Sequence, residues 1–374
     1  MRIGIDARFY GPIGKGLGRY TERLIQNLEQ VAADHEFVIF LRKENFDSFQ
    51  PRSSRFRKVL ADFGWYSAAE QFWFPPLIAK EGIDLMHFPH FNVPVLTPCP
   101  FVVTIHDLIL FRFPTRRATT LNPITYAIKY AAYRLVISLA VRRARKIITV
   151  SECTKRDIQL EFRVAPEKIV VTYEAADPSS PETSEAKPLP RLNGPYFLYV
   201  GNAYPHKNLD SLLKAFKELR DEGLNAQLVL VGKSDYFYDR LRESAESLGL
   251  LKRNDVVFAG FVEDADLAGL YRNARSYVFP SLLEGFGLPP LEAMRFGTPV
   301  AAAGNSCLPE ILGEAATYFD PRSIPDMKRA MRQTFADESV RADLATKGRE
   351  RVREFSWARC AEETYLAYVQ AINR

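Results

Sequence analysis

The sequence has few cysteines. The four present lie far apart and show no zinc-site spacing, which argues against both a zinc site and a disulfide framework. Isolated cysteines of this kind are typical of reduced thiols in a cytoplasmic protein. They are Cys99, Cys153, Cys307 and Cys360.

Long apolar runs are missing as well. No stretch approaches the roughly 20 apolar residues that a membrane span needs, so we expect no transmembrane helix. The first residues, Met1–Asp6, have the pattern of a β-strand, whereas a signal peptide needs a longer apolar run and a small-residue cleavage site. These absences predict a cytoplasmic protein.

Acidic residues are absent from one interval, between Asp107 and Glu152. Residues 1–180 hold 25 Lys and Arg against 18 Asp and Glu, whereas the remainder holds 25 against 27. A basic patch suits an anionic surface, either lipid or nucleic acid. We expect peripheral binding to the inner face of a membrane through residues 112–146 and no nucleic-acid partner; a solvated helix face is the alternative. The basic residues are Arg112, Arg116, Arg117, Lys129, Arg134, Arg142, Arg143, Arg145 and Lys146.

Three tyrosines accompany this basic interval. Tyr126, Tyr130 and Tyr133 share one helix face at i, i+4 and i+7, and aromatic side chains of this type favour a membrane interface. The competing interpretation is that these tyrosines belong to the protein core.

Short β-branched runs alternate with amphipathic stretches along the chain. With 374 residues, 47% of them apolar, the chain is long enough for two domains built from βα units. The strands expected in the first domain are Arg2–Asp6, Glu36–Leu41, Leu85–Phe88, Phe101–Ile105, Ile147–Val150 and Ile169–Thr172, with helices such as Tyr20–Ala33 and Thr125–Arg143.

The stretch Asp177–Pro195 is rich in proline and polar residues and reads as a linker. The alternation then restarts and ends in a long amphipathic helix, Trp357–Ile372. The strands expected in the second domain are Tyr196–Val200, Gln227–Val231, Val256–Ala259, Tyr277–Phe279 and Val300–Ala302, with helices at Leu209–Asp221, Tyr236–Leu248, Asp266–Ala274 and Leu288–Arg295.

This pattern predicts an α/β protein with two Rossmann-like, doubly wound domains that face each other across a cleft. We place the first domain at residues 1–180 and the second at 181–356, with residues 357–374 packing back towards the first. Ligands of such sheets bind outside the carboxyl ends of the strands, so the cleft is the expected site.

A glycine-rich turn at Ser281–Glu292 follows the strand Tyr277–Phe279 and opens a helix near Leu288. Free N–H groups at a helix start favour an anion such as a diphosphate. Glu284 and Glu292 beside it would repel that anion unless they bind hydroxyls, which indicates a sugar on each side of the diphosphate. The alternative is a capping Glu284 and a solvated Glu292.

Other candidate residues lie at expected strand ends. The loop Gly14–Tyr20 has the glycine content of a phosphate cradle or of a tight turn. His106 follows a strand, and Asp107 either orients its ring or begins the next loop.

His87 and His90 form an H-x-x-H pair that lacks a third ligand, so we expect an acceptor-side loop and no metal. Asp264-Ala265-Asp266 resembles a metal-binding D-x-D string, but we interpret it as a helix N-cap.

The string Glu-Gly-Phe-Gly-Leu-Pro-x-x-Glu at Glu284–Glu292 resembles the donor-binding motif of the retaining glycosyltransferase family GT4, whose fold is GT-B. The resemblance covers nearly the whole chain. Val200–Asn208 is similar to the second donor motif of the family, and Thr104–Leu108 and Val150–Glu152 are similar to its N-domain signatures. Within the family, the motif His106-Asp107-Leu108 most resembles that of mannosyl- and rhamnosyltransferases of surface-polysaccharide assembly.

The resemblance implies roles for the matched positions. Glu284, Lys207 and His106 would be the catalytic residues: Glu284 would contact hydroxyls of the transferred sugar, Lys207 would bind the diphosphate, and His106 would lie near the donor sugar. Glu292 would hold the ribose. The remaining donor-binding positions would be Gly16, Gly201, Asn202, Phe261, Val262, Gly285, Phe286, Gly287 and Leu288, and the acceptor-side positions would be Lys15, Arg19 and His90.

One departure from the family pattern stands out. Asn202 occupies a position where the family often has an arginine, which removes a phosphate contact and makes Lys207 more important. His206 or a residue from the other domain is a possible replacement for that arginine.

The implied function is transfer of a hexose, with mannose favoured, from a nucleotide diphosphate sugar such as GDP-mannose to a hydroxyl of a glycan or lipid-linked acceptor. The resemblance implies retention by same-face attack, with no cofactor and no metal. The alternatives are another activity on this fold, such as an epimerase or a phosphorylase, and a non-catalytic scaffold.

Overall fold

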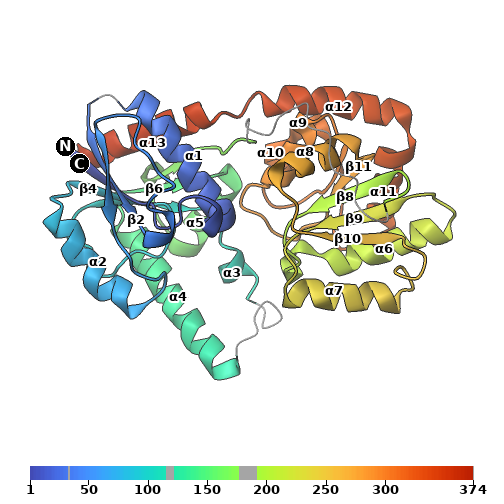
Figure 1. Ribbon diagram of the computed structural model, residues 1–374, viewed down its shortest axis with the longest axis horizontal. Helices are drawn as coiled ribbons and strands as arrows, with labels where there is room; N and C mark the ends of the chain where they lie inside the picture. The colour runs from blue at the N-terminus through green and yellow to red at the C-terminus, as the bar shows by residue number, and fades with distance from the viewer. Residues whose placement is uncertain (33, 115–121, 177–191, 374) are drawn as a thin grey trace. The chain divides into compact units, whose positions relative to one another are not determined.

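The computed structural model describes residues 1–32, 34–114, 122–176 and 192–373 (Figure 1). Most of the expected linker, residues 177–191, lies outside the described residues, as do Arg116 and Arg117. The chain forms two compact units. Unit 1 consists of Met1–Glu174 and Ser356–Arg374, and unit 2 of Ala175–Phe355.

Unit 1 is built on a parallel sheet. The described residues give it seven strands in the order β3-β2-β1-β4-β5-β6-β7. The central strands are buried along their length, as the apolar, β-branched runs predict. The strands are β1 (Arg2–Asp6), β2 (Glu36–Leu41), β3 (Phe56–Leu60), β4 (Leu85–Phe88), β5 (Phe101–Ile105), β6 (Lys146–Thr149) and β7 (Ile169–Val171).

Helices connect these strands. The amphipathic α1 buries Tyr20, Leu24, Ile25 and Leu28, and α2 begins at the N-cap Ser67, whose side chain accepts a hydrogen bond from the Glu70 amide. The helices of unit 1 are α1 (Lys15–Val31), α2 (Ala68–Lys80), α3 (Ile109–Arg112), α4 (Pro123–Arg143), α5 (Glu152–Phe162) and α13 (Trp357–Ile372).

The C-terminal helix α13 packs against α1 and the sheet of unit 1. The Tyr368 hydroxyl lies 2.6 Å from His87 Nδ1 on β4, and the Arg145 guanidinium donates to the Ala371 carbonyl at 2.7 Å. His87 Nε2 lies 2.8 Å from Thr104 Oγ1 on β5. Burial lowers the pKa of His87 to about 3, so this ring is a neutral link between the sheet and α13.

Helix α4 corrects two expectations. It is the one helix among the described residues with the length and composition of a membrane span. It has 21 residues, and Lys129 and Arg134 alone interrupt its most apolar part, so the mean hydropathy stays high. The expectation that no stretch approaches such a span is therefore wrong by that criterion. The shared tyrosine face points inward: Tyr133 is buried and Tyr130 packs against the core, as in the competing interpretation.

Unit 2 repeats the architecture with the strand order β10-β9-β8-β11-β12-β13, all parallel, in its described part. The helices α6 and α11 pack against each other, and so do α9 and α12. The strands are β8 (Tyr196–Val200), β9 (Gln227–Val231), β10 (Val256–Gly260), β11 (Ser276–Phe279), β12 (Val300–Ala303) and β13 (Ala316–Phe319). The helices are α6 (Leu209–Asp221), α7 (Tyr236–Ser247), α8 (Asp264–Asn273), α9 (Leu288–Arg295), α10 (Leu308–Leu312), α11 (Ile324–Ala336) and α12 (Glu338–Val352).

Candidate active site

Each sheet has one point where the chain reverses its direction of winding. In unit 1 this switch point lies between β1 and β4, and in unit 2 it lies between β8 and β11. The loops that leave the carboxyl ends of these strands diverge and leave a crevice, which is where open α/β sheets bind ligands. The sequence-predicted site residues are distributed over loops at this edge in both units.

In unit 2, the switch point is bridged by an ion pair. Lys207 Nζ, from the loop after β8, lies 2.5 Å from Glu284 Oε1, from the loop after β11. Both side chains are largely buried, with 14% and 9% of their areas exposed. Lys207 Nζ also lies 5.4 Å from the centre of the Phe279 ring. Two buried, opposite charges therefore lie where we expect the diphosphate and the sugar to bind.

The backbone of the turn that carries Glu284 is held by side chains from the segment after β12. Ser306 Oγ accepts from the Glu284 amide at 3.1 Å and donates to its carbonyl at 2.8 Å, and Asn305 donates to the Leu282 carbonyl at 2.8 Å. Gly287 is the N-cap of α9 with φ +93°, and a Cβ there would lie 2.8 Å from Leu308 Cδ2. Glycine is thus required at the N-cap of α9, the helix that follows the turn of Glu284.

The loop after β8 shows what stands in place of the missing arginine. Gly201 has φ +153°, and a Cβ on it would meet the Tyr199 hydroxyl at 2.7 Å. Asn202 is exposed, and its side chain accepts from the Tyr204 amide at 3.3 Å. Burial and the neighbouring Lys207 lower the pKa of His206 to about 4. His206 is therefore neutral and does not replace the arginine as a cation.

The residues expected to contact the ribose and the base lie on α9 and just after β10. Glu292 Oε2 accepts from the Tyr271 hydroxyl at 2.9 Å, which fixes this carboxylate one turn into α9. Phe261 is 71% exposed and follows β10 directly. The expectation that the D-x-D string is an N-cap is wrong: Glu263 is the N-cap of α8, and Asp264 and Asp266 lie in its first turn, where acidic residues complement the helix dipole.

In unit 1, His106 has an acceptor at each ring nitrogen. Nε2 lies 3.0 Å from the Pro89 carbonyl and Nδ1 lies 3.1 Å from Glu174 Oε1. Burial opposes the charged ring, but Glu174, the Pro89 carbonyl and Asp107 together raise the pKa of His106. An oxygen acceptor at each ring nitrogen is the arrangement that favours the protonated ring. The His106 and Tyr20 rings meet edge to face, with their centres 4.6 Å apart.

The residue that orients His106 was missed by sequence reasoning. Asp107 accepts from the Ile109 amide at 2.8 Å at the start of α3, and the carboxylate that contacts the ring is Glu174. Glu174 lies 68 residues away in sequence, just after β7, and is 6% exposed. The only signal for it was its place at the carboxyl end of a predicted strand.

The glycine-rich loop after β1 is shorter than expected. Helix α1 already begins at Lys15, so Gly16 and Arg19 lie in its first turns. A Cβ on Gly18 would lie 2.0 Å from the Gly11 carbonyl, whereas a Cβ on Gly16 meets no atom within 4 Å. Gly18 thus serves packing, and Gly16 leaves open space through which a ligand can approach. Lys15 is exposed beside it.

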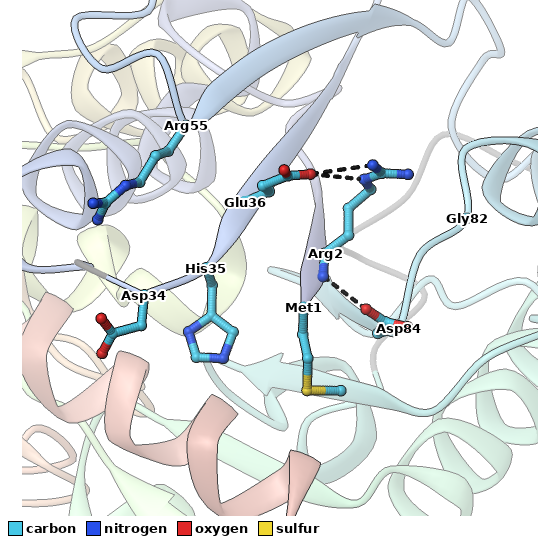
Figure 2. A pocket seen from close by; sticks show the side chains of 8 residues that line it. All are labelled: Met1, Arg2, Asp34, His35, Glu36, Arg55, Gly82 and Asp84. Atoms are coloured by element: carbon cyan, nitrogen blue, oxygen red, sulfur yellow. Dashed lines mark hydrogen bonds and ion pairs between the residues drawn. The ribbon is translucent and has the colours of Figure 1, made fainter.

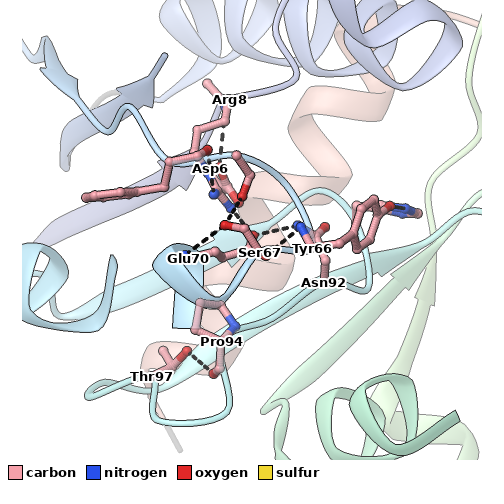
Figure 3. Close-up of polar contacts among 12 residues, drawn as sticks. Asp6, Arg8, Tyr66, Ser67, Glu70, Asn92, Pro94 and Thr97 are labelled. Carbon is pink, nitrogen blue, oxygen red and sulfur yellow. Dashed lines mark hydrogen bonds and ion pairs between the residues drawn. The ribbon is translucent and has the colours of Figure 1, made fainter. Parts of the chain in front are cut away.

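A buried ion cluster holds the loops of this edge together (Figure 3). The Arg8 guanidinium donates to both oxygens of Asp6 at 2.7 Å and to Glu70 Oε1 at 2.5 Å. Asn92 also donates to Glu70 Oε1, at 2.8 Å. The carboxylates of Asp6 and Glu70 are almost inaccessible. The cluster thus joins the end of β1 and the loop after it to the first turn of α2 and the loop after β4.

The two histidines of the H-x-x-H pair separate. His87 is the link to α13 described above, whereas His90 lies in the loop after β4 with Nε2 at 2.7 Å from the Tyr66 hydroxyl. Only His90 therefore lies at the edge where an acceptor is expected.

The cavity shown in Figure 2 lies at the opposite edge of the unit 1 sheet. It has a volume of about 590 Å³ and is lined by the amino ends of β1 and β2. Arg2 pairs with Glu36 there, and its amide donates to Asp84. The amino edge of a parallel sheet has no free strand-end loops aimed at a ligand, so we do not assign this cavity to the active site.

Known proteins match this chain over nearly its full length. The description "Glycosyltransferase Family 4" matches residues 14–180, and "Glycosyl transferases group 1" matches residues 181–351. O-antigen chain mannosyltransferase B of Escherichia coli is 32% identical over 76% of this chain and 74% of that protein. O-antigen chain mannosyltransferase RfbU of Salmonella typhimurium is 28% identical over 83% and 84%. The chain spans 47% of the length of another relative, the Escherichia coli serotype-specific mannosyltransferase WbdA.

Solved structures show the same fold. Sucrose-phosphate synthase from Thermosynechococcus elongatus has a TM-score of 0.73 at 22% identity and covers 99% of this chain and 98% of its own. WaaG, a glycosyltransferase involved in lipopolysaccharide biosynthesis, has a TM-score of 0.70 at 16% identity and covers 99% of both chains. The chain therefore belongs to glycosyltransferase family 4, and its two Rossmann-like units are those of the GT-B fold.

Proposed function

We propose that this glycosyltransferase moves a hexose, with retention of configuration, from a nucleotide diphosphate sugar to a hydroxyl of a glycan or lipid-linked acceptor. The observation that carries the proposal is the buried Lys207–Glu284 pair across the unit 2 switch point. A buried ion pair contributes little to stability in comparison with apolar packing, so its presence at the carboxyl edge of the sheet favours a functional role.

The donor supplies groups that match each half of this pair. The diphosphate takes Lys207 Nζ and lies at the positive end of the α9 dipole, and both stabilise the charge that develops on the leaving group. Glu284 then accepts hydrogen bonds from hydroxyls of the hexose, and Glu292 from those of the ribose. The acceptor attacks from the face that the diphosphate leaves, and a phosphate oxygen takes the acceptor proton.

Mannose is the favoured hexose because the relatives with about 30% identity are named mannosyltransferases. A thermal-shift panel with GDP-mannose, GDP-glucose, UDP-glucose and dTDP-rhamnose tests the donor. We expect GDP-mannose to raise the melting temperature most and to be consumed when a mannose oligosaccharide is added. A protein that binds none of these nucleotide sugars would contradict the proposed function.

We also propose that transfer needs no divalent metal. Lys207 and the positive end of the α9 dipole are the partners proposed for the diphosphate, and the D-x-D string lies in a helix turn where its charges complement the dipole. Transfer in excess EDTA should therefore match transfer without it. Loss of activity in EDTA that manganese or magnesium restores would show that the enzyme uses a metal.

We further propose that unit 1 binds an anionic membrane through the outward face of α4. Ile124, Ile128 and Leu135 follow one stripe and are exposed by 73%, 66% and 59%. Lys129, Arg134, Arg142 and Arg143 are exposed on the same helix. Not all of the expected basic patch contributes, because Lys146 is buried, Arg145 donates to α13 and the Arg143 guanidinium donates to the Val95 and Thr97 carbonyls. Each remaining basic residue near an anionic leaflet contributes about 1 kcal/mol.

Co-sedimentation with vesicles containing phosphatidylglycerol tests this surface. We expect binding to decrease with salt, and to decrease strongly in Ile128→Glu because an apolar contact is replaced by a charge that the leaflet repels. Leu366→Glu, at a 58% exposed position on α13, is the matched control and should bind normally. Wild-type protein that stays in the supernatant at low salt would favour a soluble acceptor.

A further inference from the structure

Tyr66 has the most unusual environment at the carboxyl edge of unit 1. Its φ is +56°, a region that side-chain-bearing residues rarely adopt, and its side chain is 62% exposed. An exposed aromatic ring in a strained backbone gains nothing from burial. Strain of this kind persists only where the surroundings impose it, and it concentrates at ligand-binding sites.

The surroundings that impose this conformation are the buried ion cluster. The Tyr66 amide donates to Glu70 Oε2 at 2.9 Å, while Glu70 Oε1 is held by Arg8 and Asn92. Figure 3 shows the Tyr66 backbone directed at Glu70 and its ring directed away from the cluster. One carboxylate therefore fixes the Tyr66 backbone against the loops that follow β1 and β4.

The ring itself is fixed at its far end. The Tyr66 hydroxyl lies 2.7 Å from His90 Nε2, and the ring centre lies 6.0 Å from that of Phe91. Phe91 in turn packs on the buried Tyr133, with ring centres 4.9 Å apart. His90 is held from another side by the Phe9 ring. The result is a rigid aromatic surface with a phenol and an imidazole at its margin.

We propose that Tyr66 is a binding platform for a sugar ring of the acceptor glycan, with His90 at its edge; this rests on the proposed function. The face of an aromatic ring carries negative charge and attracts the polarised C–H groups of a pyranose. The phenol and imidazole supply hydrogen bonds to its hydroxyls. Fixing the platform before binding lowers the entropy that the acceptor must overcome. Glu70 is a positioning residue, because it acts through the Tyr66 backbone.

The test compares Tyr66→Gly with Tyr66→Phe in the full chain, with mannotriose as the acceptor probe and GDP-mannose as the donor. Glycine adopts positive φ without strain and removes the ring, so the melting temperature should stay near that of the wild type. We expect the KM for mannotriose to rise by about tenfold or more in Tyr66→Gly and to change much less in Tyr66→Phe, which keeps the platform. GDP-mannose binding should be unchanged in both.

The control is Tyr236→Ala, which removes a tyrosine that is 50% exposed on α7 and is expected to leave the KM unchanged. Saturation-transfer NMR with mannotriose, with and without GDP, gives a readout that needs no turnover. A Tyr66→Gly protein that binds mannotriose as the wild type does would overturn the proposal, as would a wild type that binds GDP-mannose but not mannotriose. Failure to bind any nucleotide sugar would instead contradict the proposed function.

Discussion

Substitution of Glu284 by alanine is expected to reduce sugar transfer by about 10²- to 10³-fold or more, the range for loss of one preorganised electrostatic contact in an active site. Glu284 is 9% exposed and is held between Lys207 and Ser306. Alanine would leave Lys207 without its carboxylate partner, and the hydroxyls of the hexose would lose the carboxylate that accepts their hydrogen bonds. The turnover number should therefore decrease more than the affinity for the donor.

Glu292→Ala provides the contrast. Its carboxylate lies in α9 and is bound by the Tyr271 hydroxyl, at the position assigned to the ribose. Loss of a charge-assisted hydrogen bond costs on the order of 1.5–3 kcal/mol, so nucleotide affinity should decrease by about tenfold or more. Glu338→Ala, at a highly exposed position on α12, is the control and should behave as the wild type. Near-normal turnover by Glu284→Ala would refute the role assigned to this residue.

The buried strands could be predicted from the sequence to within a residue or two. β1, β2, β4 and β5 have the expected bounds because each is a short, mainly apolar run that is buried along almost all of its length. The two strands that were not expected, β3 and β13, are both at sheet edges. β3 includes the exposed Arg57 and the half-buried Lys58, whose ammonium donates to the Phe46 carbonyl, so its pattern resembles that of a loop.

The candidate site was predictable where a local motif carried it. The turn and helix start at Leu288 follow from glycines within a few residues of each other, and α9 begins there. Contacts between distant segments were not predictable. The partner of His106 is 68 residues away, and the Lys207–Glu284 pair joins positions 77 residues apart. No single-sequence pattern encodes which loops meet at a switch point.

The Arg8 cluster illustrates the same limit and leads to the largest expected effect on stability. Asp6, Arg8 and Glu70 lie in a strand end, a loop and a helix start that sequence periodicity does not connect, yet these residues are 2%, 0% and 0% exposed. Arg8→Met would leave two buried carboxylates without their cation. Breaking a buried ion pair by removing one partner costs about 3–5 kcal/mol.

Urea denaturation followed by tryptophan fluorescence can measure this loss in unit 1 alone, because Trp65, Trp73 and Trp357 all belong to that unit. Arg57→Met removes an exposed pair with Glu81 in the same unit and is the control. Surface pairs of this kind contribute about 0–1 kcal/mol. Equal effects of the two substitutions would show that the cluster is no more important than a surface contact.

The pH dependence of the Arg8→Met variant separates lost charge pairing from lost packing. Burial already raises the pKa of Glu70 in the wild type, against the effect of Arg8, and removal of Arg8 should raise it further. A carboxyl group whose pKa is higher in the folded than in the unfolded state contributes stability below its unfolded pKa of about 4.3, and this is lost as the pH rises. The stability deficit of Arg8→Met relative to the wild type should therefore be largest near pH 8 and narrow towards pH 5, because Glu70 takes up a proton. A deficit that is the same at both pH values would indicate that Arg8 contributes through packing alone.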